Sequence, residues 1–222
     1  CGDRLIEQEQ WICLNCLHHI PRTNFHLSAD NPVAQIFYGR VPIEYATSFF
    51  YFSKGSQYQT LLHSLKYKGM KEIGEEMGGM FGRELTASPF KMVDLVIPVP
   101  LHPQKQRKRG FNQSEWIARG IAAEMGKPLS TGNLIRNLSN PTQTRKNRFE
   151  RWQNVEGIFS VAGPELIRLK HILLGVPDVS LAAEEIVGLL TAELDRVSPF
   201  KQFITGADGQ DQLPPQVRNL RR

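Results

Sequence analysis

Apolar residues recur at helical spacing in three stretches of the chain, residues 57–67, 71–85 and 112–125. In each stretch they are separated by three or four positions, so they share one face of a helix. The first stripe consists of Tyr58, Leu61, Leu62 and Leu65. The third stretch begins at Asn112, whose side chain can cap a helix, and Gly126 ends it. The pattern therefore predicts three amphipathic helices.

The stretch 71–85 is unusual for a helix because it contains four glycines. They are Gly74, Gly78, Gly79 and Gly82. Each glycine destabilises a helix interior by roughly 1 kcal/mol relative to alanine. Close packing against another element is the expected compensation, because a glycine lets a neighbouring backbone approach.

Short apolar runs predict strands between and beyond these helices. Residues 93–99 and 170–174 contain runs typical of buried strands, and residues 41–52 are rich in aromatic and β-branched types. Residues 129–161 alternate polar loops with short strands, and a further helix is expected at 181–195. Strands that alternate with helices indicate an α/β domain with a largely parallel sheet.

Composition and charge narrow the class of partner. Hydrophobic residues make up 41% of the 222 residues and charged residues 22%, values typical of a globular protein. No run approaches the roughly 18 apolar residues that a membrane-spanning helix needs, so we expect a cytoplasmic protein. The net charge of +5 favours an anionic partner, such as a nucleotide, a diphosphate or nucleic acid, without choosing among them.

All three cysteines lie in the first sixteen residues. Cys13 and Cys16 form a C-x-x-C pair, the spacing with which two thiolates reach one tetrahedral zinc ion, and Cys1 is a candidate third ligand. Candidates for the fourth ligand are a cysteine upstream of Cys1, His18, His19 and His26. A redox pair or reduced thiols are the alternatives. Because residues 1–26 are too few to bury a core, we expect this module to fold around a structural zinc.

The stretch 94–113 joins a strand end to a run of positive charge. The apolar strand stops at Pro98 and Pro100, and a loop without acids precedes the helix that begins near Asn112. The basic residues of this loop are Lys105, Arg107, Lys108 and Arg109. Backbone N–H groups at a helix start favour an anion, so the pattern suits a phosphate-bearing ligand. A solvated basic loop is the alternative.

Three motifs follow one another along the chain after the cysteine module. They are LLHSLKYKG at 61–69, IPVPLH at 97–102 and PTQT at 141–144. The second continues with Arg107, Arg109, Gly110, Phe111, Asn112 and Gln113, and the third with Arg148, Arg151, Asn154, Val155, Gly157 and Phe159. With these motifs in this order, residues 1–174 resemble the ComF family of competence-associated bacterial proteins.

The resemblance implies a fold similar to the type I phosphoribosyltransferases. A parallel sheet with flanking helices would then occupy residues 27–174, after the zinc-knuckle module of residues 1–26. Those enzymes bind phosphoribosyl diphosphate with Mg²⁺ through two adjacent acids and a Thr-Thr-Gly loop that follow a buried strand. Here the strand ending at Leu174 continues as GVPDVSL, with one acid and no Thr-Thr-Gly. Residues 175–222 are thus a divergent segment that ends in a loose polar tail, and the sequence speaks against turnover.

The resemblance places the diphosphate side of the site in the loop after Val99. The candidate ligand-binding residues are Pro100, His102, Arg107, Arg109, Gly110, Asn112 and Gln113. Two basic clusters supply candidate nucleic-acid contacts, namely Lys105, Lys108, Arg145, Lys146, Arg148 and Arg151. Aromatic residues near them, such as Phe111, Phe149 and Trp152, suit base stacking by single-stranded DNA. A place for these aromatic side chains in the core is the alternative.

The leading hypothesis is a ComF-like protein that acts in DNA uptake during natural transformation. It would bind an anionic ligand, either single-stranded DNA or a phosphorylated nucleotide, and work with other DNA-uptake proteins. One alternative is an active transferase that uses phosphoribosyl diphosphate and Mg²⁺. The other is an inactive or frameshifted remnant. The sequence specifies neither an acceptor substrate nor an oligomeric state.

Overall fold

The computed structural model describes residues 4–35, 37–39, 43–51, 56–137, 159–162 and 172–175. Its helices are α1 (Leu14–His18), η1 (Phe25–Leu27), α2 (Pro32–Gln35), α3 (Gln57–Tyr67), α4 (Lys71–Thr86), η2 (Pro89–Met92), α5 (Pro103–Arg109) and α6 (Gln113–Met125). Its strands are β1 (Leu95–Pro98), β2 (Leu134–Arg136), β3 (Phe159–Val161) and β4 (Ile172–Gly175). The three predicted amphipathic helices are confirmed as α3, α4 and α6.

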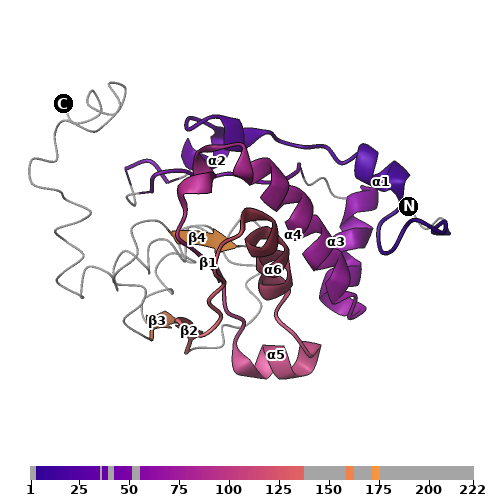
Figure 1. Ribbon diagram of the computed structural model, residues 1–222. Helices are drawn as coiled ribbons and strands as arrows, with labels where there is room; N and C mark the ends of the chain where they lie inside the picture. Colours follow the sequence, from indigo (N-terminus) through magenta and orange to yellow (C-terminus); the bar gives the residue numbers. More distant parts are fainter. Residues whose placement is uncertain are drawn as a thin grey trace, which may run out of the picture.

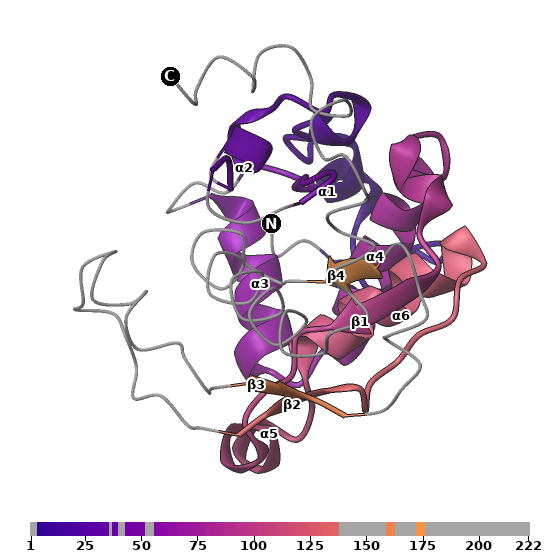
Figure 2. The ribbon, with the colours of Figure 1, turned by 90° about the vertical axis from the view of Figure 1, so that its left-hand side faces the viewer.

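The strands form two small pairs, of which β1 and β4 lie against α6, whereas β2 and β3 lie at the edge of the structure (Figures 1 and 2). β1 and β4 are parallel, in a register that runs from Leu95 opposite Ile172 to Pro98 opposite Gly175. Val96 also donates its N–H to the carbonyl of Pro128 at 2.9 Å. β2 and β3 are antiparallel. The predicted strands at 93–99 and 170–174 therefore do pair in parallel, and the described residues form a mixed α/β structure.

The crossing of α4 and α6 brings two backbones into direct contact. A Cβ at Gly78 would lie 2.1 Å from the carbonyl oxygen of Ile117, and one at Gly120 would lie 2.1 Å from that of Glu75. No side chain fits at either position. The predicted close packing is therefore confirmed at Gly78, whereas a Cβ at Gly79 would make only an ordinary contact. The crossing sits on β1, where Val96 is fully buried against both helices.

The N-terminal segment, by which we mean the described residues between 4 and 51, packs against α3 and α4. One buried cluster joins Ile12, Cys16 and Ile20 to Tyr58 of α3 and Met77 of α4. The Tyr58 hydroxyl also donates a hydrogen bond to the carbonyl of His19. Burial of these apolar side chains, each worth roughly 1.5–3 kcal/mol when complete, fixes the segment on the helices.

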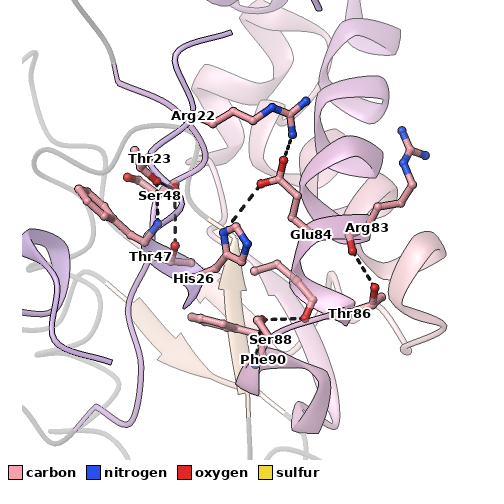
Figure 3. Close-up of polar contacts among 12 residues, drawn as sticks. Arg22, Thr23, His26, Thr47, Ser48, Arg83, Glu84, Thr86, Ser88 and Phe90 are labelled. Atoms are coloured by element: carbon pink, nitrogen blue, oxygen red, sulfur yellow. Dashed lines mark hydrogen bonds and ion pairs between the residues drawn. The ribbon is translucent and has the colours of Figure 1, made fainter. Parts of the chain in front are cut away.

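A second attachment of the N-terminal segment is polar. Arg22, His26 and Glu84, which we call the Glu84 junction, meet where this segment crosses the end of α4 (Figure 3). Arg22 forms an ion pair with Glu84, and its guanidinium carbon lies 5.3 Å from the centre of the Phe49 ring. His26 is buried, and its Nδ1 lies 3.8 Å from the second oxygen of Glu84.

Two predictions about local structure are wrong. Of the strand expected at 41–52, residues 43–51 make only an isolated bridge between Arg22 and Phe50, and Phe49 is instead buried in the core. The basic stretch expected as a loop is the short helix α5. His102 caps this helix through its Nδ1, which accepts the N–H of Gln104 at 3.3 Å, and Gly110 ends it with a φ of +85°.

Other expectations concern residues outside the described part of the chain. These are the helix at 181–195 and the segment from 176 to 222, including the polar tail. The described helices are each too short or too polar to cross a bilayer.

Candidate anion-binding pocket

A pocket of about 220 Å³ opens at the carboxyl end of β1. The end of α3, the segment after β1 and the start of α6 surround it, and both views place the lower end of α3 near α5 (Figures 1 and 2). Its lining residues are Lys66, Tyr67, Val99, Pro100, Leu101, Arg109, Asn112, Gln113, Ser114 and Arg136. Three of these side chains are cationic and none is acidic, so the pocket attracts negative charge.

Asn112 lines this pocket and connects two of the elements around it. Its buried side chain donates from Nδ2 to the carbonyl of Val99 at 2.9 Å, and its Oδ1 accepts the N–H of Ser114 at 3.2 Å. One amide thus joins the end of β1 to the first turn of α6. The N-terminus of a helix carries partial positive charge, so this connection places a favourable end of α6 at the pocket.

Gln113 supplies a buried hydrogen-bond donor beside it. The residue is only 3% exposed, and its Oε1 accepts a hydrogen bond from an Arg109 nitrogen at 2.9 Å. A guanidinium can only donate, so this contact identifies the oxygen of the amide. The remaining atom, Nε2, has no hydrogen-bond partner among the described residues. A buried donor left in this state costs about 1–3 kcal/mol, which a ligand oxygen would recover.

Positive charges gather at one side of the pocket. Burial lowers the pKa of Lys105 on α5, and the nearby charges of Arg136 and Arg109 lower it further. Arg136 reaches this cluster from β2, where its guanidinium carbon lies 5.3 Å from the Phe159 ring centre. Like charges held together repel one another, so an anion that binds between them is stabilised.

The predicted ligand-binding residues divide into two groups. Pro100, Arg109, Asn112 and Gln113 line the pocket. The others shape or flank α5: His102 caps it, Gly110 ends it and Arg107 is exposed on it.

The predicted nucleic-acid contacts are only partly within the described residues. Lys105 is half-buried on α5 beside the charge cluster, and Lys108 is exposed on the same helix. The second basic cluster, Arg145, Lys146, Arg148 and Arg151, lies outside the described residues, together with Phe149 and Trp152. Phe111 is half-buried.

Several lining residues were not among the predicted site residues. Lys66 and Tyr67 come from the end of α3, and Arg136 comes from β2. The sequence carried a weak signal for each, since the first two belong to the LKYKG motif and Arg136 precedes the second basic cluster along the chain. Their contribution depends on the tertiary fold, which brings three separate elements to the end of β1.

The two described cysteines, Cys13 and Cys16, lie side by side at α1 in the N-terminal segment. Cys13 caps α1, and the N–H of Cys16 contacts its Sγ at 3.4 Å. Burial raises the pKa of the Cys16 thiol. His18 and His19 are exposed, His26 belongs to the Glu84 junction, and Cys1 lies outside the described residues. Two adjacent thiols fit half of a tetrahedral zinc site, and no group of three candidate metal ligands occurs within the described ranges.

These features define a mixed α/β protein with a cationic pocket at the carboxyl end of a parallel strand. The chain is similar to the DNA utilization protein YhgH of Salmonella typhimurium (strain LT2), with 24% identity over 108 residues. The alignment covers 47% of this chain and 48% of YhgH, so it spans about half of that relative. No protein-family model matches the chain. No solved structure matches it either.

Proposed function

We propose that this chain is a ComF-like protein of DNA uptake or utilization that binds phosphate groups in the pocket at the end of β1. The ligand is single-stranded DNA or a phosphorylated nucleotide. The observation that carries the proposal is the buried Nε2 of Gln113, a donor that has no hydrogen-bond partner in the described part of the chain. The described lining of its pocket contains no acid and includes Lys66, Arg109 and Arg136. The similarity to a protein named for DNA utilization supports the biological setting.

The residues divide the work of binding as follows. Gln113 donates to a phosphate oxygen, while Arg109 and Arg136 neutralise its charge. Arg109 is already oriented by its hydrogen bond to Gln113 and by the Tyr67 ring, 5.6 Å from its guanidinium carbon. A guanidinium held in this way loses less conformational freedom when the ligand binds.

A phosphoribosyltransferase-like fold is part of the proposal. It is supported by the parallel pairing of β1 and β4 and by a pocket at the carboxyl end of β1, where ligands of open α/β sheets bind. The stretch directly after Leu174, GVPDVSL, contains one acid in place of the acidic pair and has no Thr-Thr-Gly loop. We therefore propose binding without glycosyl transfer.

Salt dependence and two arginine variants test the DNA ligand. We expect affinity for single-stranded DNA to fall steeply with salt, because each neutralised phosphate releases counterions. Substituting Arg109→Ala and Arg148→Ala together should weaken binding at least tenfold for every sequence. Arg83→Ala is the matched control, since Arg83 is an exposed arginine of α4 that pairs with Glu124 of α6. Unchanged affinity in the double variant would rule out this ligand site.

Calorimetric titration with phosphoribosyl diphosphate and Mg²⁺ tests the transferase alternative. We expect no release of diphosphate when nucleotides or DNA are supplied as acceptors. Absence of heat at millimolar ligand excludes the alternative, whereas binding followed by diphosphate release establishes it and contradicts our proposal.

We also propose a structural zinc ion held by Cys1, Cys13 and Cys16 with a fourth ligand. The supporting observation is the contact between the buried Cys13 and Cys16. About one zinc per chain, lost in Cys13→Ser together with much of the folding stability, is the expected result. A folded, metal-free protein contradicts it.

A further inference from the structure

Tyr67 is an unusually open aromatic side chain at the edge of the anion-binding pocket. It keeps 65% of its surface exposed, a value that only Leu27 equals among the large hydrophobic residues of the described chain. It is the last residue of α3 and lines the pocket together with Lys66. The apolar surface of an exposed tyrosine ring contributes to stability only when it is buried. A ligand that covers the ring is therefore favoured.

Other flat groups surround this ring. The His63 ring centre lies 4.7 Å from that of Tyr67, with a tilt of 42° between the planes. The guanidinium carbon of Arg109 lies over the Tyr67 ring, 5.6 Å from its centre. A planar ligand that covers Tyr67 would therefore meet a ring and a guanidinium, both of which stack on nucleobases.

Two helix ends with opposite partial charges border the pocket, so they favour different parts of a ligand. The start of α6 favours negative charge, whereas the end of α3 carries partial negative charge of its own. A phosphate is thus directed to Gln113 at the start of α6. A neutral ring is directed to Tyr67 at the end of α3.

We propose that Tyr67 is a stacking platform for a base of single-stranded DNA whose phosphate occupies the pocket. This inference rests on the proposed function and adds to it a residue that recognises the base. It predicts a preference for strands that carry bases over strands that offer the same phosphates without them.

The test compares two oligonucleotides of about ten residues, within the roughly 4–16 nucleotides that such sites cover. One is oligothymidylate, and the other is an abasic strand of the same length and charge. Stacking on an aromatic side chain contributes about 1–3 kcal/mol per base, so we expect at least fivefold tighter binding of the strand with bases. Fluorescence anisotropy with labelled strands at fixed salt measures both affinities.

Three variants identify the residue responsible for that ratio. Tyr67→Ala should bring the ratio of the two affinities close to one, and Tyr67→Phe should preserve it because the ring remains. Tyr51→Ala is the matched control, since Tyr51 is 55% exposed on the N-terminal segment and does not line the pocket. It should leave the ratio unchanged.

The outcomes separate this inference from the proposal beneath it. If both strands bind wild-type protein equally, or if Tyr67→Ala leaves the ratio intact, the platform is overturned while phosphate binding stands. If neither strand binds, the DNA ligand itself is wrong, and the platform is rejected with it.

Discussion

The chain holds two arginines in similar surroundings with different consequences. Arg22 lies over the Phe49 ring at 5.3 Å, and Arg109 lies over the Tyr67 ring at 5.6 Å. Arg22 is paired with the carboxylate of Glu84, and Phe49 is 9% exposed. Arg109 instead donates to the neutral amide of Gln113, and its aromatic partner is 65% exposed.

The difference shows how one pair of residue types can serve either structure or binding. At the Glu84 junction a carboxylate from α4 balances the guanidinium charge, so the contact fixes the N-terminal segment in place. In the pocket an amide orients the guanidinium without cancelling its charge. The positive charge therefore remains available to an anion, and the aromatic ring remains available to a flat ligand.

The largest effect should come from disturbing the helix crossing that supports both regions. Gly78→Ala would place a Cβ against the Ile117 carbonyl, so α4 and α6 must separate. We expect the free energy of unfolding to fall by about 3 kcal/mol, at the upper end of the cost of overpacking. Denaturation with urea measures it.

Gly79→Ala is the control for this substitution. Its Cβ would meet Glu124 at an ordinary 3.6 Å, and alanine favours a helix, so stability should stay constant or rise. Equal losses in both variants would show that the close crossing is not the cause.

The next largest effect should be on anion affinity. It should come from a substitution that places a carboxylate beside Arg109, as Glu84 stands beside Arg22. Gln113→Glu removes the Nε2 donor and adds a negative charge beside Arg109. We expect anion affinity to fall at least tenfold, or about 1.4 kcal/mol, with no loss of folding stability. Gln113→Ala, which removes the donor without adding charge, should cause a smaller loss of affinity. A Gln113→Glu variant that binds DNA normally would contradict the comparison.

The reciprocal substitution removes the carboxylate from the junction. Glu84→Gln leaves the Arg22 charge unbalanced, and we expect the free energy of unfolding to fall by about 1 kcal/mol. This is less than the roughly 1.5–3 kcal/mol of a charged hydrogen bond, because Arg22 is 34% exposed. Affinity for DNA should not change. Arg109→Gln should show the opposite pattern, with normal stability and weakened binding, so the two variants together test whether the regions are independent.

The smallest effect concerns pH. Burial, followed by the charge of Arg22, lowers the pKa of His26, so the folded protein favours the neutral imidazole. Stability is then full above the ordinary histidine pKa of about 6.5 and declines as pH falls through the lowered value. Unfolding measured between about pH 7 and 5.5 should show this decline in wild type and lose it in His26→Phe. His63→Ala, at an exposed histidine, should retain the decline.

Periodicity predicted the elements whose stripes face the core. The apolar stripe of α3 and the cap and stop of α6 appear in the structure as the sequence indicates. The sequence predicted a loop in place of α5, because PQKQRKR has no apolar stripe. Its capping histidine, first-turn proline and final glycine make it helical. For residues 43–51 the prediction failed in the opposite direction. Phe49 is buried in the core, Tyr45 and Tyr51 are exposed, and the segment forms only an isolated bridge instead of a strand.

The sequence likewise predicted only some of the residues that line the pocket. One motif contains Arg109, Asn112 and Gln113. Their closeness in the sequence was therefore enough to predict them as ligand-binding residues. Tyr67 and Arg136 join them only through the packing of α3 and β2 around the end of β1. Which cations of α5 line the pocket also depends on helix geometry, because Arg107 and Arg109 lie on different sides of the same short helix.

The pairing of β1 with β4 has a consequence for the order of synthesis. Among the described residues, every side chain that lines the pocket lies between residues 66 and 136, but the strand that pairs with β1 begins only at Ile172. A ribosome that has translated residue 136 has made these lining residues and has yet to make β4. One edge of β1 stays open during that interval, and unpaired strand edges promote association between nascent chains.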